Sequence, residues 1–181
     1  MRWQVGVILA VLAILGAAPV QASDENTAHG PFSVHLGVGS NLSEGGNLQS
    51  LSLGYDASGG VSLLVNVERQ HIPTRLRSFS ATRGGTLTSL SGELRYTVPL
   101  GGRVSPFVAA GLGAGISRPN VNDHFSNAVS NTAKFAYAGG GVRVRLRPRL
   151  DVFVDGRFQL MAERDVLAGR LPIRAGVTWR F

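Results

Sequence analysis

The run Asp123-His124-Phe125-Ser126 is the segment whose residue types come nearest to a hydrolytic site. A base beside a nucleophile, with an acid to orient the base, is the set of groups that acyl transfer requires. Residues adjacent in sequence rarely reach that geometry, because a triad is assembled from separate parts of a fold. We therefore interpret the run as a polar surface loop and predict no catalytic residues. A hydrolytic site at His124 and Ser126 is the alternative.

The other residues that could bind a metal or a cofactor form no pattern. The chain has four histidines and no cysteine, which excludes a disulfide scaffold and a cysteine nucleophile and leaves no metal-ligand spacing. The glycines fall in turns and alternating segments, not at a strand-to-helix junction where a phosphate loop would begin. We expect neither a metal nor a cofactor.

The first 22 residues have the pattern of a secretory signal peptide. Arg2 precedes an apolar run of about 14 residues that Pro19 ends, which is shorter than the roughly 20 residues of a spanning helix. Val20-Gln21-Ala22 offers a small-x-small cleavage site. We predict a cleaved signal peptide over 1–22 and one mature domain over 23–181, with an uncleaved anchor as the alternative.

The composition narrows the class of protein further. The chain has 181 residues, of which 44% are hydrophobic and 16% charged, with a formal net charge of +7. This length fits one domain, and the low charged fraction argues against intrinsic disorder. A single long apolar run excludes a multi-helix membrane protein. Since the chain is exported, its basic charge favours anionic lipid heads over nucleic acid.

The mature chain alternates apolar and polar residues in segments of about ten, which is the period of β-strands. Eight such segments are expected, over 32–40, 48–56, 61–70, 88–98, 106–116, 135–146, 150–160 and 173–181. Short turns (56–60, 99–103, 147–149) alternate with mostly longer connections (41–47, 71–87, 117–134, 161–171). The pattern predicts an all-β fold, an eight-stranded antiparallel up-and-down transmembrane barrel.

Alternation alone leaves two orientations, because a soluble lipocalin-type barrel carries its polar face outside. Tyr55, Tyr96 and Trp179 fall on the apolar face near the short-turn ends, where an interfacial aromatic girdle belongs. We therefore predict that the apolar face meets lipid, and that His35 is a hydrogen-bonded residue of the lumen. The predicted lumen charge network consists of Glu68, Glu93, Arg95, Arg143, Arg145, Asp155, Arg157, Arg174 and Arg180. Its arginines outnumber its carboxylates, so water or an anion must complete it.

The closing strand, residues 173–181, and the segment Pro106-Phe107-Val108-Ala109-Ala110-Gly111-Leu112-Gly113 resemble the small eight-stranded outer-membrane barrels of the OmpA transmembrane-domain-like and OmpX-like family. The resemblance implies location in the Gram-negative outer membrane. It also implies that Val177, Trp179 and Phe181 are read by the barrel-assembly machinery, with periplasmic chaperones as partners during biogenesis. The chain ends at the barrel, so the peptidoglycan-binding domain of full-length OmpA is not expected.

One long connection is rich in arginine. Arg75, Arg77 and Arg83 lie close to Arg69 and His71, and arginine suits bidentate recognition of phosphate. On an outer surface this favours contact with lipopolysaccharide, and a solvated loop is the alternative.

We expect a monomeric barrel with a structural or surface-interaction role. The alternatives are a lipid A acyl hydrolase, although the His-Ser dipeptide of the lipid A deacylases is absent, and a narrow pore.

Overall fold

The computed structural model describes residues 30–43, 45–73, 75–77, 80–82, 84–119, 131–163 and 166–181. The predicted signal peptide and the run 123–126 lie outside these ranges. Among the described residues, no helix has the length and apolar character that crossing a membrane requires.

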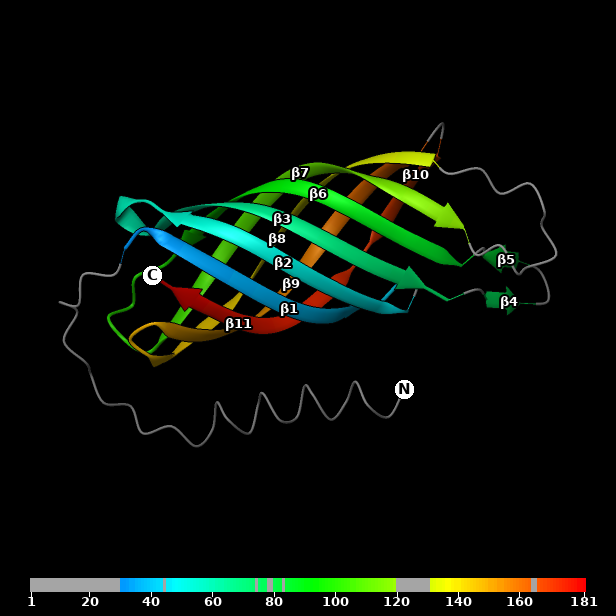
Figure 1. Cartoon of the computed structure of the whole chain (residues 1–181). Coiled ribbons are helices and arrows are strands. Elements are labelled where there is room, and N and C mark those ends of the chain that lie inside the picture. The colour runs from blue at the N-terminus through cyan, green and yellow to red at the C-terminus, as the bar shows by residue number, and fades with distance from the viewer. Residues whose placement is uncertain are drawn as a thin grey trace.

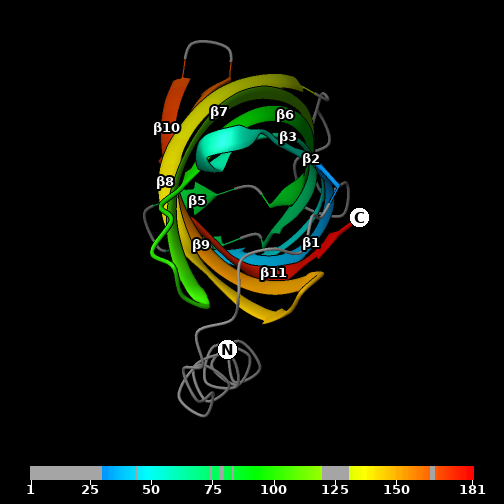
Figure 2. The same cartoon turned by 90° about the vertical axis from the view of Figure 1, so that its left-hand side faces the viewer.

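Eight antiparallel strands form a closed barrel (Figures 1 and 2). Seven are continuous: β1 (Phe32–Asn41), β2 (Asn47–Asp56), β3 (Val61–Ile72), β6 (Gly85–Thr97), β7 (Val104–Pro119), β8 (Asn131–Arg147) and β9 (Leu150–Glu163). The eighth is interrupted and consists of β10 (Val166–Arg170) and β11 (Pro172–Arg180), both paired with β9. Because β11 also pairs with β1, and β9 with β8, the barrel is closed. Within the part of the chain that the structure describes, β10 pairs only with β9. The predicted eight-stranded up-and-down barrel is confirmed.

Two predicted strand boundaries are wrong. The connection predicted over 161–171 is mostly strand, since β10 pairs with β9 from Val166 onward. Lys134, expected in a loop, lies in β8. In both places the strands continue past the segment of clear apolar alternation, because hydrogen bonding between neighbouring strands does not depend on that pattern. The connection after β3 also contains a short hairpin, β4 (Arg75–Arg77) with β5 (Ser80–Thr82), which was not predicted.

The short turns and the C-terminus lie at one end of the barrel, and β4 and β5 lie at the other (Figure 1). One short turn is the 3-10 turn η1 (Ser58–Gly60). Gly60 has a φ of +81°, and a Cβ there would lie 2.5 Å from the carbonyl oxygen of Thr97. Glycine is therefore needed both for the left-handed backbone and for the close approach to the end of β6.

The two faces of the wall differ as the membrane orientation requires. Large apolar side chains project outward, as shown by Leu112, which is 72% exposed, while Arg174 is 1% exposed inside. Tyr55, Tyr96 and Trp179 are exposed near the short-turn end, in agreement with the predicted girdle. Val144 is buried although it alternates with lumen-facing arginines; its strand partners on either side are also valines.

Candidate functional site

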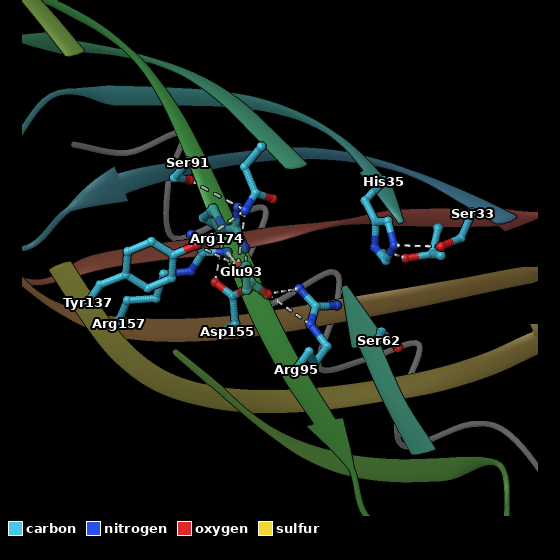
Figure 3. A network of polar contacts seen from close by, with 12 residues as sticks. Ser33, His35, Ser62, Ser91, Glu93, Arg95, Tyr137, Asp155, Arg157 and Arg174 are labelled. Carbon is cyan, nitrogen blue, oxygen red and sulfur yellow. Dashed lines mark hydrogen bonds and ion pairs between the residues drawn. The ribbon is translucent and has the colours of Figure 1, made fainter. Parts of the chain in front are cut away.

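A cluster of three arginines and three carboxylates occupies the middle of the lumen (Figure 3). Its side chains come from four strands and are at most 7% exposed. We call it the central cluster: Glu68 on β3, Glu93 and Arg95 on β6, Asp155 and Arg157 on β9, and Arg174 on β11. Its formal charges cancel, which is the condition under which buried ions are tolerated.

Two arginines of the central cluster bridge strands that are distant in sequence. The Arg157 guanidinium lies 3.0 Å from Glu68 and 2.7 Å from Glu93. Arg174 donates two hydrogen bonds to Asp155, at 3.0 and 2.6 Å, and a third to Glu68 at 2.7 Å. These charge-assisted bonds tie together β3, β6, β9 and β11 across the lumen.

Glu93 is the most heavily bonded acid in the central cluster. Its carboxylate accepts hydrogen bonds from Arg95 at 3.0 and 2.8 Å and from the Tyr137 hydroxyl at 2.9 Å, in addition to Arg157. The Asn66 amide donates to the same carboxylate at 3.3 Å. Four side chains therefore depend on one carboxylate that is fully buried.

Aromatic rings fill much of the space that the arginines leave, and this was not predicted. The Arg95 guanidinium lies 4.4 Å from the ring centroid of Phe107, and that of Arg157 lies 4.6 Å from that of Tyr137. Phe153 lies 5.8 Å from Arg174. Such cation–π contacts stabilise a desolvated guanidinium. The phase of alternation could have shown these rings, because each lies in step with lumen-facing positions of its strand.

A second group of charges lies near the short-turn mouth. Asp151 is 2.7 Å from Arg180 and 3.6 Å from Arg143, and Asp56 is 3.7 Å from Arg180. The two aspartates were absent from the predicted network. Arg143 and Arg145 are half-buried, and Arg145 forms no ion pair with the described residues.

His35 lies between two hydroxyl groups. The Ser33 Oγ is 3.1 Å from Nε2, and the Thr178 Oγ1 is 2.8 Å from Nδ1. This matches the interpretation of His35 as a hydrogen-bonded lumen residue. A hydroxyl, a base and an orienting group are also the parts of a hydrolytic site, but all three residues are at most 5% exposed, so a substrate has no access to them.

The remaining predicted residues are spread over the barrel. Val177, Trp179 and Phe181 are exposed on the outer wall and at the C-terminus. Arg75 and Arg77 lie in β4, while Arg83 is outside the described residues. No group of three or more histidines and carboxylates within the described ranges could hold a metal ion.

A closed barrel with an apolar outer wall and a charged, hydrogen-bonded interior defines an integral membrane β-barrel. Residues 8–181 match the family model of the outer membrane protein beta-barrel domain. The chain belongs to this family and is an outer-membrane protein, which confirms the resemblance read from its closing strand.

Solved structures with the same fold include small outer-membrane barrels from three bacterial sources. Neisserial surface protein A is 18% identical, with a TM-score of 0.69 over 86% of this chain and 100% of that one. The N-terminal barrel of Pseudomonas aeruginosa OprF is 18% identical (TM-score 0.56, 85% and 100% covered). Ail of Yersinia pestis is 14% identical (TM-score 0.51, 83% and 99% covered). Comparison with curated protein sequences gives no match.

Proposed function

We propose that this barrel serves the outer membrane as a non-enzymatic structural and surface-interaction protein. The central cluster carries the proposal. It crosses a lumen that, in an eight-stranded barrel, is only wide enough for side chains, and its ion pairs join β3, β6, β9 and β11 across that lumen. This supports a closed lumen over the narrow-pore alternative, and it leaves the outer wall and the long loops as the surfaces that can meet partners.

We further propose that lipopolysaccharide is the partner of the loop end. Arg69, Arg118 and Lys134 are exposed near the loop ends of β3, β7 and β8. The acidic side chains that the structure describes lie instead in the lumen or at the short-turn mouth: Asp56, Glu68, Glu93, Asp151 and Asp155. The charged side chains that the structure describes at the loop-end rim are therefore cations, which suits the phosphates of lipopolysaccharide, and Arg75, Arg77 and Arg83 would extend this surface.

The double variant Arg69→Gln/Arg118→Gln tests this contact. A cation near an anionic membrane surface contributes about 1 kcal/mol, so we expect roughly 30-fold weaker binding of lipopolysaccharide by the purified barrel in neutral detergent. The matched control is Arg147→Gln/Arg149→Gln, two exposed arginines at the opposite end. Equal losses in the two variants, or equal binding of dephosphorylated lipopolysaccharide by the wild type, would refute the proposed contact.

The enzymatic alternative depends on His124 and Ser126. Their replacement by alanine is expected to leave the mass profile of lipid A unchanged in cells that express the barrel, because the proposal gives these residues no chemical role. Cells without the barrel are the reference. A lipid A species that requires the barrel and disappears in the His124→Ala/Ser126→Ala variant would establish an acyl hydrolase instead.

A further inference from the structure

A polar cavity of about 210 Å³ opens at the short-turn mouth of the barrel. This volume is far above the roughly 10–15 Å³ that a single ordered water needs. Its polar wall comes from the ends of β6, β7 and β8, with Thr97, Ser105, Arg143 and Arg145, and from the glycine turn Gly101-Gly102. A Cβ added at either glycine would meet no atom within 4 Å, so the turn leaves open space beside the arginines.

Thr97 has a hydrogen-bonding group that the described protein does not satisfy. Thr97 is among the residues that line the cavity, it is only 6% exposed, and its buried Oγ1 has no hydrogen-bond partner within the described residues. A buried hydroxyl without a partner costs about 1–3 kcal/mol of desolvation, so such groups are normally paired. Because Thr97 is among the residues that line the polar cavity beside Arg143 and Arg145, an acceptor bound there would lie next to this unpaired hydroxyl.

The charge balance at this mouth favours an acceptor that is negative. Six arginines lie on the strand ends and turns at this end of the barrel, and two of them, Arg143 and Arg145, line the cavity; the six are Arg103, Arg143, Arg145, Arg147, Arg149 and Arg180. The described acidic side chains at the same end are Asp56 and Asp151 alone, and both engage Arg180. Arg143 keeps only a 3.6 Å contact with Asp151, and Arg145 has no carboxylate within 4 Å among the described residues. The positive charge on the cavity wall is therefore only partly compensated, by the contact between Arg143 and Asp151.

We propose that this cavity binds a phosphate-class oxyanion at the short-turn mouth of the barrel, which is the periplasmic end in bacterial outer-membrane barrels. Arg145 and Arg143 supply the guanidinium donors, Thr97 and Ser105 supply hydroxyl donors, and the glycine turn leaves room for the anion to enter. The same chemistry would accept the headgroup phosphate of a phospholipid from the inner leaflet or a free phosphate from the periplasm. Leu100 also lines the cavity and is 63% exposed.

The test follows thermal unfolding of the mature barrel in a maltoside detergent, with the fluorescence of Trp179 as the signal. Inorganic phosphate is titrated against chloride at equal ionic strength. In the second arm, phosphatidylglycerol is added to the micelles and compared with diacylglycerol, which lacks the headgroup phosphate. The variants are Thr97→Val and Arg145→Gln, and the control is Arg149→Gln, an exposed arginine outside the cavity wall.

We expect the anion to raise the unfolding temperature of the wild type and of Arg149→Gln, and to bind about tenfold more weakly to Arg145→Gln and Thr97→Val. Without anion, Thr97→Val should unfold no earlier than the wild type, because valine removes an unpaired hydroxyl at nearly constant shape. A response to phosphate alone assigns the site to a soluble anion, and a response to phosphatidylglycerol alone assigns it to a lipid. Equal stabilisation of the wild type and both cavity variants, or none of any, overturns the proposal.

Discussion

Glu93→Gln is expected to lower the free energy of unfolding of the barrel by about 3–5 kcal/mol, the cost of breaking a buried ion pair from one side. The carboxylate is the shared acceptor of Arg95 and Arg157, and both guanidinium groups are at most 4% exposed. Glutamine keeps the shape of the side chain but removes its charge, so two buried cations lose a common counter-charge. Urea unfolding of the refolded barrel, followed by its shift in gel mobility, measures the loss.

Asp56→Asn is the matched control for that experiment. Its side chain is 28% exposed and 3.7 Å from Arg180, so the same loss of one carboxylate charge should cost no more than about 1 kcal/mol. Similar losses in the two variants would show that the central cluster does not stabilise the barrel.

Ion current through planar bilayers tests whether the lumen is closed. The wild type should conduct no current, whereas a steady conductance would favour the narrow pore.

The sequence could predict which side chains face the lumen, but it could not pair them. Alternation of period two assigns Glu68, Arg157 and Arg174 to the polar face of their strands without any knowledge of the fold. Their contacts depend on the register between strands, and Glu68 meets Arg174 across 106 residues of sequence. Register in a barrel follows from shear and closure, which no single strand encodes.

Other lumen residues were missed in the sequence analysis for a different reason. Asp151 is in step with Asp155 on the polar face of its predicted strand, and Asp56 is in step with Ser50 and Ser52, but both lie at strand ends and were left out of the predicted network. They supply carboxylates that this network lacked. Phe107 and Phe153 were not assigned to the lumen because aromatic residues in a membrane barrel are expected on the lipid side. A ring face is, however, a favourable neighbour for an arginine. The ring fills lumen volume without adding a charge, whereas a second carboxylate in the same place would add one.

The lumen therefore combines two ways of accommodating arginine. In the central cluster each guanidinium meets carboxylates, and an aromatic ring lies within 6 Å. At the short-turn mouth the described carboxylates are fewer than the arginines. The same residue type thus holds the wall together in the middle of the barrel and leaves positive charge available at its short-turn end.

Leu112→Arg is expected to lower the free energy of unfolding by about 2–4 kcal/mol in phospholipid vesicles, the cost of a cation near the midplane of a bilayer. Leu112 lies halfway along β7 and is 72% exposed on the outer wall, so the substitution creates no clash and removes no internal contact. Leu100→Arg is the control: it makes the same chemical change at a residue 63% exposed in a short turn, outside the hydrocarbon. If water surrounded the barrel, both variants would change its stability by no more than about 0.5 kcal/mol. A large loss confined to Leu112→Arg can arise only where the middle of the outer wall contacts lipid, and small, equal losses would contradict the membrane orientation from which the roles of the lumen, the rim and the mouth all follow.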